Sequence, residues 1–327
     1  MKNLQIGIIG GAGYTAGELI RLLLNHPATY INFVYSTSNA GNKLYKVHQD
    51  LIGDTEINFT SKINTDVDVL FLCLGHGNST AFLEKTTFSD NTKIIDLSND
   101  FRLLADKNFK GKDFVYGLPE LDKESIKTAK YIANPGCFAT TIELALLPLA
   151  KHQALKNEVH VTAITGSTGA GQAATNTSHF SWKNNNVSIY KAFEHQHLAE
   201  IKESLNHLQQ DFTKAVNFIP VRGNFSRGIL ASVYTTCEWS LIEAMVHYQN
   251  YYLNHPFVVI SDENIDVKQA VNTNKCLLHL EKHGDKLLIV SCIDNLLKGA
   301  SGQAVQNMNI MFGLPEDAGL RLKPVAF

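Results

Sequence analysis

Short apolar runs alternate with stretches of helical spacing through the first third of the chain. The apolar runs have the length of buried strands, and the stretches between them have the spacing of amphipathic helices. The expected strands are Leu4–Ile9, Ile31–Ser36, Val67–Leu74 and Lys93–Leu97, and the expected helices lie near Gly17–Asn25 and Thr80–Lys85. Because strands that alternate with helices form βαβ units, the pattern predicts a Rossmann-like, doubly wound parallel sheet in an α/β protein.

The pattern changes after a further strand-like run, Lys130–Ala133, and the apolar helix pattern that follows it. Two of the later strands are separated only by the turn His283–Asp285, which favours antiparallel pairing. The expected strands are Val159–Ile164, Ile229–Thr236, Cys276–Glu281 and Lys286–Cys292, and the expected helices are Leu198–Leu208 and Leu241–Tyr252. We therefore expect an α+β domain with a mixed, largely antiparallel sheet.

The length of 327 residues favours two domains. The change of pattern places the first domain at residues 1–139 and the second at residues 140–295. A last helical pattern, Gly302–Phe312, ends at Gly313–Pro315 and could return to the first domain. We therefore expect the segment 296–327 to complete the first domain.

A glycine-rich string, Gly10–Gly17, separates the first strand from the first helix. Glycines allow a tight turn and a close approach of the backbone to a pyrophosphate, which would lie at the N-terminus of the helix. Because a strand precedes the string and an amphipathic helix follows it, we interpret it as a dinucleotide-binding loop. The residues expected to contact the cofactor there are Gly10, Gly11, Ala12, Gly13, Tyr14 and Thr15.

The end of the second strand indicates which dinucleotide is bound. NAD-binding domains usually carry an acidic residue there for the ribose hydroxyls, whereas this chain has the segment Ser36–Lys43. The hydroxyls of Ser36 and Ser38 and the amine of Lys43 suit a 2′-phosphate, so the sequence favours NADP(H) over NAD. Lys43 could equally be a solvated loop lysine.

Cys137 lies where the strand-like run gives way to a helix, directly after Asn134–Gly136. The N–H groups and the dipole at a helix N-terminus stabilise an anion, so they lower the pKa of a cysteine and favour the nucleophilic thiolate. The same N–H groups could stabilise the oxyanion of a tetrahedral intermediate. The alternative is a structural cysteine, because free cysteines are among the residues most often buried.

A cysteine nucleophile needs a neighbouring acid or base, and His195 and His197 are the best candidates. They follow the tract Thr165–Gly171, whose small and hydroxyl-bearing residues suit a loop beside a cofactor or substrate. Among 13 histidines a chance pair is common, so a structural role is one alternative. Half of a metal site is another, but no further cluster of ligand residues supports it, and we expect no metal.

The segment Asp96–Arg102 follows a strand of the expected parallel sheet, where the carboxyl ends of the strands border the ligand crevice. Arg102 could bind a phosphate or a carboxylate through two parallel hydrogen bonds. On its own, a surface ion pair is the more common role for such an arginine.

Composition and charge indicate which partners, location and cysteine chemistry to expect. Charged residues make up 18% of the chain and the formal net charge is −2, so we expect a small-molecule substrate and no nucleic-acid partner. No apolar stretch has the length of a membrane helix and no signal-peptide pattern precedes Leu4, so we expect no membrane association and a cytoplasmic location. The five cysteines lack paired spacing and are expected to be reduced thiols: Cys73, Cys137, Cys237, Cys276 and Cys292.

Several of these segments occur together in one family. Besides the glycine string, Asn134–Cys137 and the histidine pair, the shared motifs are Ser38–Gly41, Asp96–Leu103, Tyr116–Leu121, Thr168–Gly171 and Ile293–Met308. In their order and spacing they make the chain resemble the type 1 N-acetyl-gamma-glutamyl-phosphate reductases of arginine biosynthesis, in the aspartate-semialdehyde dehydrogenase superfamily. The resemblance runs almost from end to end.

The resemblance implies NADPH-dependent reduction of N-acetyl-L-glutamyl 5-phosphate to N-acetyl-L-glutamate 5-semialdehyde, with release of phosphate. Cys137 would form a thioester, a hydride would reduce it, and His195, or else His197, would act as the acid/base. It also implies an NADP-binding first domain and a catalytic and dimerisation second domain, in a homodimer or homotetramer. Further implied contacts are Gly75, Thr168, Gly169 and Gly171 to the cofactor, and Ser98, Arg102, Asn134 and Gln172 to the substrate.

Three residues depart from the family pattern. Many members have arginine where this chain has Gln196 and a basic residue where it has Gln172, so two cations are missing near the expected acyl-glutamate site. Ala16 occupies a position of the cofactor loop that is usually glycine, which related fingerprints tolerate. Because the two cations at positions 172 and 196 are missing, the acyl group could be succinyl or another group instead of acetyl. The remaining alternatives are an aspartate-semialdehyde dehydrogenase and, from a different class, a non-catalytic NADP-sensing module.

Overall fold

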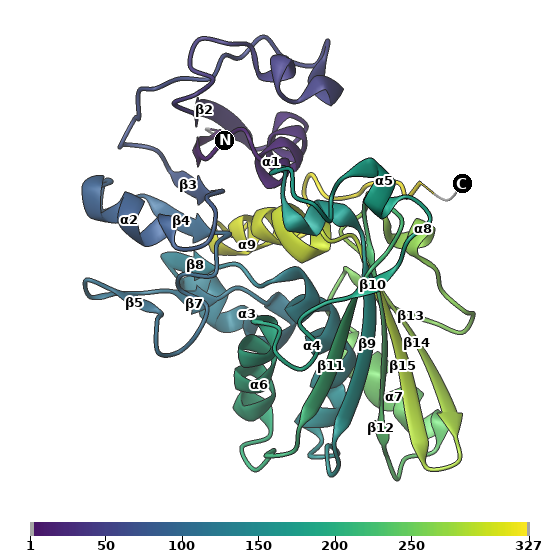
Figure 1. Cartoon of the computed structure of the whole chain (residues 1–327). Helices are drawn as coiled ribbons and strands as arrows, with labels where there is room; N and C mark the ends of the chain where they lie inside the picture. Colours follow the sequence, from purple (N-terminus) through teal and green to yellow (C-terminus); the bar gives the residue numbers. More distant parts are fainter. Residues whose placement is uncertain (1–2, 326–327) are drawn as a thin grey trace. The chain divides into compact units, whose positions relative to one another are not determined.

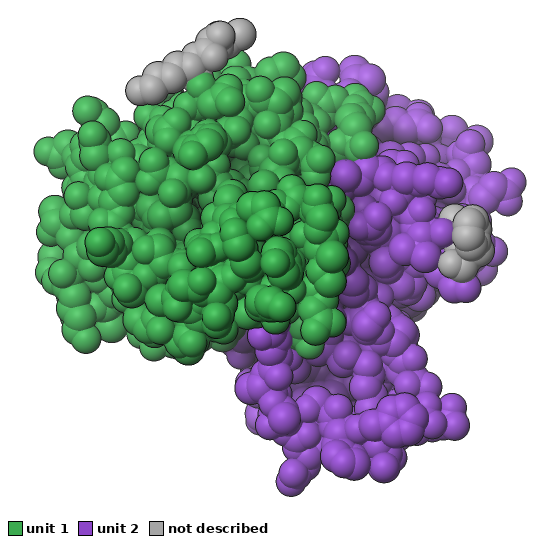
Figure 2. Space-filling model, turned by 90° about the horizontal axis from the view of Figure 1, so that it is seen from above, with its two compact units in different colours: residues 1–135, 300–321 green, residues 136–299, 322–327 purple. Residues whose placement is uncertain are grey.

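The computed structural model describes residues 3–325, and the chain divides into two compact units, which Figure 2 colours separately. Unit 1 consists of Met1–Pro135 and Ala300–Arg321, and unit 2 of Gly136–Gly299 and Leu322–Phe327. The sequence analysis placed the corresponding boundaries after residues 139 and 295. Each unit has a main sheet of its own (Figure 1), and Cys137 lies at the start of unit 2.

Unit 1 contains a parallel sheet with the strand order β2-β1-β3-β4-β8-β7. Its strands are β1 (Leu4–Ile9), β2 (Thr29–Tyr35), β3 (Val69–Leu72), β4 (Lys93–Asp96), β7 (Val115–Tyr116) and β8 (Tyr131–Ala133), and a hairpin of β5 (Asn108–Phe109) and β6 (Lys112–Asp113) lies outside it. The strand order reverses at β1, which has β2 on one side and β3 on the other. The predicted Rossmann-like parallel sheet is confirmed.

Both faces of this sheet are covered. Leu70 and Leu72 of β3 pack in an apolar cluster with Phe82 of α2, whereas Phe71 points to the opposite face and is equally buried. Burial on both faces explains why β3 reads as a continuous apolar run. The helical elements of unit 1 are α1 (Tyr14–Leu24), η1 (Leu44–Lys46), η2 (Gln49–Leu51), α2 (Asn78–Lys85), α3 (Pro119–Thr128) and α9 (Gly302–Met311). Although α9 is distant in the sequence, it contacts α1 and α3 (Figure 1).

Unit 2 contains a mixed sheet with the strand order β10-β11-β9-β12-β15-β14-β13. Its strands are β9 (Val159–Thr165), β10 (Ser188–Ile189), β11 (Val216–Arg222), β12 (Ile229–Thr236), β13 (Val258–Ser261), β14 (Cys276–His283) and β15 (Lys286–Ile293). The pairs β9–β11 and β13–β14 are parallel and the other pairs are antiparallel. The predicted mixed, largely antiparallel sheet is confirmed, although the sequence analysis missed β10, β11 and β13.

Three long helices cover one face of the unit 2 sheet. They are α4 (Cys137–Lys151), α6 (His197–Leu208) and α7 (Leu241–Tyr252), and the shorter elements are η3 (Ser167–Ala170), α5 (Phe180–Lys183), α8 (Val267–Ala270) and η4 (Leu297–Ser301). α4 contacts β12, β14 and β15, while α6 contacts β11. Along β12, Ala231 and Val233 are buried, whereas Ser232 and Tyr234 are exposed, so the other face of the strand remains open to solvent.

The helix α4 is the most deeply packed element of unit 2. Every residue from Phe138 to Ala150 is buried. Two tyrosines of α7 bind that helix to α4. The hydroxyl of Tyr248 donates to Ala145 O and that of Tyr252 donates to Leu144 O, both at 2.5 Å. The N-terminal end of α4, which carries Cys137, is therefore held by a rigid element.

One end of the unit 2 sheet collects several loops. Thr165 at the end of β9 pairs with Arg222 at the end of β11 and with Ile229 at the start of β12. Ile229 in turn pairs with Ile293 at the end of β15. The segments that follow Thr165, Arg222 and Ile293 therefore leave the sheet at the same edge.

Candidate active site

The glycine string of unit 1 forms the turn between β1 and α1, where the strand order reverses. Gly10 has a φ of +78°, and a Cβ added there would lie 2.5 Å from the carbonyl oxygen of Cys73, in the loop after β3. A Cβ on Gly11 would collide with Val34 Cγ1 of β2. The loop therefore needs glycine at both positions to lie this close to its neighbouring strands.

The N-terminus of α1 suits a phosphate group. Gly13 is the N-cap residue and has no side chain, so the first N–H groups of α1, from Tyr14 and Thr15, face an open end of the helix. A Cβ on Gly13 would meet no described atom within 4 Å, so there is room beside these groups. α1 begins at Tyr14 and not near the expected Gly17, because the last residue with extended backbone is Gly13 and the rest of the string is helical.

His48, which the sequence analysis did not single out, supports this loop. Its Nε2–H donates to the carbonyl oxygen of Gly11 at 2.7 Å. A Cβ on Gly17 would lie 2.6 Å from His48 Nδ1, so Gly17 provides the close packing contact of α1. The alanine at position 16 therefore leaves that contact intact. The cradle of Gly10, Gly11, Ala12 and Gly13 fits the pyrophosphate of a dinucleotide.

The end of β2 carries hydroxyl and amide groups. Ser36 Oγ lies 3.4 Å from Ser38 Oγ, and the side-chain amide of Asn39 donates to both hydroxyls. Lys43 pairs with the Glu56 carboxylate at 3.1 Å and donates to the Glu56 carbonyl oxygen at 2.7 Å. Lys43 would therefore have to exchange Glu56 for a phosphate in order to bind one.

Gly75 lies in the loop after β3. Its carbonyl oxygen accepts a hydrogen bond from the amide of Asn78 at 3.1 Å, at the start of α2. The preceding Cys73 donates its amide to Ile9 O at 2.9 Å. The Gly75 loop therefore follows directly from the point where β1 and β3 reach the same sheet edge.

Ser98 and Arg102 belong to a buried network around Asp96 of β4. The hydroxyls of Ser79 and Ser98 each donate to the Asp96 carboxylate at 2.6 Å. Arg102 donates Nη2 to Leu97 O at 3.1 Å and lies near enough to favour the ionised carboxylate. The Ser98 hydroxyl also accepts from the amide of Asp100 at 3.1 Å, so its side chain stabilises the loop after β4.

Burial outweighs these hydrogen bonds and raises the pKa of Asp96 to about 6. The folded protein therefore holds this proton up to about pH 6, whereas an unfolded chain releases it near its ordinary value of 3.8. Because the folded state binds more protons in that window, stability falls as pH rises through it. We expect Asp96→Asn to remove this loss, so that its free energy of unfolding relative to wild type rises by about 2–3 kcal/mol between pH 4 and 7.

Thermal and urea unfolding at several pH values measure this difference, with Asp100→Asn as the control. Burial raises the pKa of Asp100 as well, but hydrogen bonds, first from the amides of Thr80 and Gly77, outweigh it and lower that pKa below its ordinary value of 3.8. The Asp100 variant should therefore lose stability relative to wild type only as pH rises toward about 4, and this difference should stay nearly constant from there to pH 7. A difference between Asp96→Asn and wild type that does not change with pH would show that Asp96 is ionised throughout.

Asn134 lies three residues before Cys137, and its side chain makes hydrogen bonds within unit 1. Its amide nitrogen donates to Ala300 O at 3.1 Å, and its amide oxygen accepts from Asn307 Nδ2 of α9 at 3.2 Å. Asn307 also donates to Gly117 O at 2.8 Å. The segment that leads to Cys137 is therefore tied to the C-terminal part of unit 1.

In unit 2, Cys137 is the first residue of α4, as predicted, and Gly136 is the N-cap residue. The amide of Thr140 donates to Gly136 O at 2.8 Å and closes the first helical turn. Gly299 packs beside Cys137, because a Cβ there would lie 2.7 Å from Cys137 Cβ. The segment η4, which contains Gly299, and the helix α4 together fix the position of the cysteine backbone.

His195 lies in a cluster of rings that includes Phe138, the residue after Cys137. Its ring centroid is 5.3 Å from that of Phe138 and 4.6 Å from that of His197. The amide of His197 donates to His195 Nδ1 at 3.2 Å, which assigns the proton of the neutral ring to Nε2.

The charge state of His195 follows from its surroundings. Burial, and then the positive charge of Lys191, lower the pKa of His195 to about 4, while the Glu200 carboxylate partly offsets both. His195 is therefore neutral near pH 7, with Nε2–H as a hydrogen-bond donor.

Glu200 connects His197 to the N-terminus of α4. It is 4% exposed, and its Oε2 accepts a hydrogen bond from the amide of Gly136 at 2.9 Å. Its Oε1 lies 3.9 Å from His197 Nε2, one turn earlier on α6. The carboxylate therefore holds the N-cap residue of α4 and one histidine at once. The sequence analysis missed Glu200; the signal was its position one helical turn after His197.

We expect Glu200→Ala to lower kcat about tenfold or more, because it leaves the Gly136 amide without this acceptor in a buried place and releases the start of α4. Glu200→Gln keeps an acceptor and removes the charge, so its kcat should fall less. Since the Glu200 charge raises the pKa of His195, the acidic limb of the kcat/KM profile should move to lower pH in the glutamine variant. Equal kcat values for alanine, glutamine and wild type would exclude this positioning role.

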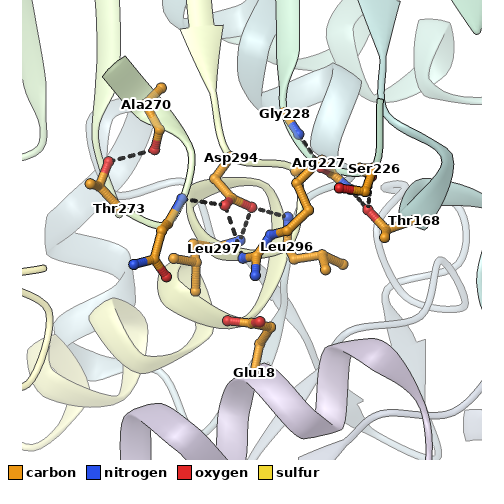
Figure 3. Close-up of polar contacts among 12 residues, drawn as sticks. Glu18, Thr168, Ser226, Arg227, Gly228, Ala270, Thr273, Asp294, Leu296 and Leu297 are labelled. Carbon is orange, nitrogen blue, oxygen red and sulfur yellow. Dashed lines mark hydrogen bonds and ion pairs between the residues drawn. The ribbon is translucent and has the colours of Figure 1, made fainter. Parts of the chain in front are cut away.

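Asp294, directly after β15, organises the loops at the shared sheet edge (Figure 3). Its carboxylate is fully buried and pairs with Arg227 at 2.9 Å. The amide donors to it are those of Asn272 at 2.7 Å, Leu296 at 2.8 Å and Leu297 at 3.2 Å. Its carbonyl oxygen accepts from the amide of Gly299 at 3.0 Å, so Asp294 also fixes the glycine that packs on Cys137.

Asn295 extends this arrangement to the predicted cofactor loop. Its side chain accepts from the amide of Gly228 at 2.7 Å and donates to Thr168 Oγ1 at 3.0 Å. The Thr168 hydroxyl in turn donates to Ser226 O at 2.7 Å (Figure 3). The loop of Thr168 and Gly169 is therefore attached to the end of β15, and Gly171, with a φ of +81°, ends it.

The two glutamines that depart from the family pattern have different surroundings. Gln172 is exposed. Gln196 is the N-cap residue of α6, and its side-chain oxygen accepts from Lys191 Nζ at 3.4 Å. A lysine therefore lies beside the position where the resemblance leads us to expect arginine.

The described residues show neither a metal-binding cluster nor a membrane-spanning helix. Within residues 3–325, histidine, cysteine and acidic side chains form no group of three or more suited to a metal ion. In the same range, no helix combines the length and the apolar character needed to cross a bilayer.

Comparison with known families identifies the class. The model described as the semialdehyde dehydrogenase NAD-binding domain matches residues 5–129, and the model described as the semialdehyde dehydrogenase dimerisation domain matches residues 137–295. Aspartate semialdehyde dehydrogenase II from Vibrio cholerae has a TM-score of 0.72 at 18% identity, over 96% of this chain and 99% of that chain. Aspartate semialdehyde dehydrogenase with NADP from Candida albicans has a TM-score of 0.67 at 13% identity, over 95% of this chain and 99% of that chain. The fold is thus that of a semialdehyde dehydrogenase.

Curated relatives narrow the class further. N-acetyl-gamma-glutamyl-phosphate reductase of Flavobacterium johnsoniae is 61% identical over 99% of this chain and all of its own length. The proteins of the same name from Christiangramia forsetii and Parabacteroides distasonis are 61% and 59% identical, over 98% and 99% of this chain and 98% and 100% of their own lengths. The chain belongs to the N-acetyl-gamma-glutamyl-phosphate reductase family.

Proposed function

We propose that the protein reduces N-acetyl-L-glutamyl 5-phosphate to N-acetyl-L-glutamate 5-semialdehyde and phosphate with NADPH, in arginine biosynthesis. The observation that carries the proposal is the position of Cys137 at the N-terminus of α4, where the ring of the next residue, Phe138, contacts the neutral His195. The high identity to curated relatives of that name over almost the whole chain supports it.

The residues of unit 2 suit covalent catalysis. The Cys137 thiolate attacks the acyl carbon of the substrate, the bond from that carbon to the phosphate oxygen breaks, and phosphate leaves. The resulting thioester is a better hydride acceptor than a carboxylate. The nicotinamide, when bound, supplies the hydride. The tetrahedral oxyanion then collapses, the C–S bond breaks, and the aldehyde leaves behind the thiolate that began the cycle.

The role of His195 follows from its hydrogen bonds. Because Nδ1 accepts the His197 amide, the ring presents Nε2–H, which we assign as a donor to the substrate oxygen when it becomes negative. The N–H groups at the start of α4 act on the same charge. His197 holds its place next to Glu200, and we assign it a substrate-binding role.

The contacts to the pyrophosphate and the 2′-phosphate belong to unit 1 in this proposal. The loop of Gly10 to Thr15 would hold the pyrophosphate, with the Gly75 loop beside it, and the hydroxyls of Ser36 and Ser38 support NADP(H) over NAD because the end of β2 offers hydrogen bonds in place of a carboxylate. Lys43 would then leave Glu56 for the 2′-phosphate. Arg102 and Asn134 are proposed near the leaving phosphate, with Ser98 as their support.

We also propose that the protein is a homo-oligomer. The match to a dimerisation domain over residues 137–295 supports self-association through unit 2. The face of the unit 2 sheet away from α4 exposes Tyr234 and Val259, both apolar enough for a contact between copies. Light scattering coupled to gel filtration measures the mass in solution.

The test is phosphate-dependent reduction of NADP⁺, or of NAD⁺, with N-acetylglutamate semialdehyde, followed spectroscopically in the reverse direction. We expect turnover that needs phosphate, a higher kcat/KM with NADP⁺, and a kcat/KM for aspartate semialdehyde that is lower by about 100-fold or more. A preference for aspartate semialdehyde would favour an aspartate-semialdehyde dehydrogenase. Binding of NADP⁺ without turnover of any acyl-glutamate semialdehyde would favour a sensing module.

A further inference from the structure

Arg222, the last residue of β11, lies on the face of the unit 2 sheet that carries the catalytic cluster. Side chains alternate along a strand, so Arg222 shares its face with Phe218 and Pro220. The Phe218 ring centroid is 5.1 Å from that of Phe138 and 5.4 Å from that of His195. Arg222 therefore points to the same side as the residues next to Cys137.

Tyr190 holds the guanidinium in this cluster. Arg222 Cζ lies 3.8 Å from the centroid of the Tyr190 ring, and the same ring is 6.0 Å from that of His195. The amide of Tyr190 donates to Pro220 O at 3.2 Å, so the ring is fixed to the strand that carries Arg222. Burial, and then the Cys137 sulfur, raise the pKa of Tyr190, while Arg222 partly offsets them, so the phenol is neutral near pH 7.

The positive charge of Arg222 has no carboxylate partner among the described residues. Among the described residues, no aspartate or glutamate forms an ion pair with Arg222, whereas its neighbour Arg227 pairs with Asp294. Arg222 is half-buried, so water screens its charge only in part. A bound anion would therefore stabilise this cation. Stacking on the ring face leaves the edge of the guanidinium, with its N–H donors, for that anion.

The anion has to come from the substrate or the cofactor. Gln172 and Gln196 are uncharged, so the described cations near His195 are Lys191, which donates to Gln196, and Arg222. Arginine binds carboxylate through two parallel hydrogen bonds, which fixes orientation as well as charge. The acyl-glutamate has an α-carboxylate, and a dicarboxylic acyl group such as succinyl would add a second one.

We propose that Arg222, held against Tyr190, binds a carboxylate of the acyl-glutamate substrate and thereby aligns its acyl carbon with Cys137. The proposal rests on the proposed function and names the group that selects the substrate. The α-carboxylate and the terminal carboxylate of a dicarboxylic acyl group have the same chemistry, and the experiment separates these two sources.

The experiment compares wild type, Arg222→Gln and Arg222→Lys with N-acetylglutamate semialdehyde, N-succinylglutamate semialdehyde and the α-amide of the acetyl compound. We expect Arg222→Gln to raise KM for a carboxylate substrate about 10- to 100-fold while kcat changes less than about threefold, and Arg222→Lys to recover part of the loss. KM for NADP⁺ and for phosphate should stay unchanged. Arg321→Gln, which removes a surface arginine paired with Asp317, is the matched control and should behave as wild type.

The pattern of losses identifies the carboxylate. If Arg222→Gln raises KM for both semialdehydes but not for the α-amide, Arg222 binds the α-carboxylate. If it raises KM for the succinyl compound alone, Arg222 binds the terminal carboxylate of the succinyl group. An unchanged KM for every semialdehyde in a folded Arg222→Gln, or an increase confined to phosphate or NADP⁺, overturns the proposal. If wild type turns over none of the semialdehydes, the proposed function itself fails, and that result is read before any variant is compared.

Discussion

Replacement of Cys137 by serine is expected to reduce kcat by about 10³-fold or more while the protein keeps its fold and its affinity for the dinucleotide. A thiol is partly ionised near pH 7 and a serine hydroxyl is not, so the variant lacks the nucleophile that begins each cycle. The cysteine is the first residue of α4 and only partly buried, so the substitution should change stability little. Rapid-quench mass spectrometry should find an acyl adduct on wild type and none on the variant.

The control is Cys237→Ala. Cys237 is buried in unit 2, where burial raises the pKa of its thiol, so it should react slowly with iodoacetamide and contribute nothing to turnover. We expect alkylation of wild type to inactivate it with modification of Cys137. Full activity of Cys137→Ser, or an acyl adduct on another residue, would refute the thioester mechanism.

Substitution of Gly299 by alanine is expected to lower kcat about 100-fold although the residue has no functional group. The added methyl would lie 2.7 Å from Cys137 Cβ and 3.2 Å from Ile293 Cδ1. Because the Cys137 backbone belongs to a buried helix, the collision displaces the thiol or the segment beside it, and small displacements of a nucleophile have large effects on rate. KM for the cofactor should change little, because its proposed loop lies in unit 1. Single-turnover kinetics of thioester formation measure the effect.

Gly284→Ala provides the comparison. Gly284 lies in the turn between β14 and β15 and has a φ of +58°, so alanine there is strained, but a Cβ would meet no described atom within 4 Å. That variant should melt at a lower temperature and keep the kcat of wild type. If Gly299→Ala loses stability but keeps its kcat, the glycine serves folding alone.

The alternation of strands and helices predicted unit 1 well because its strands are buried on both faces and read as uninterrupted apolar runs. The run at β3 and the glycine string after β1 are clear examples. In unit 2, β11 was missed because Pro220 interrupts its pattern, and a proline argues against a strand. It is tolerated near the edge of the sheet, where only the two-residue β10 lies outside β11.

The candidate site was predictable where local chemistry shows in the sequence. A cysteine at a strand-to-helix junction and a pair of histidines are visible as residue types, and the structure places Cys137 and His195 near the same ring, that of Phe138. Glu200 and Gly299 were not visible, since each acts through a contact with a residue far away in the chain. The burial of Ser98 and the pairing of Lys43 with Glu56 likewise depend on the fold.

The burial of α4 has a consequence for the lifetime of the reactive thiol. Every residue from Phe138 to Ala150 is packed, and two tyrosine hydroxyls bind its carbonyl groups, so this helix cannot fray from within. Its amide hydrogens should exchange with solvent only through global opening of unit 2. The geometry around Cys137 is therefore lost all at once, on unfolding, and the enzyme should inactivate on heating in a single cooperative step instead of losing activity gradually.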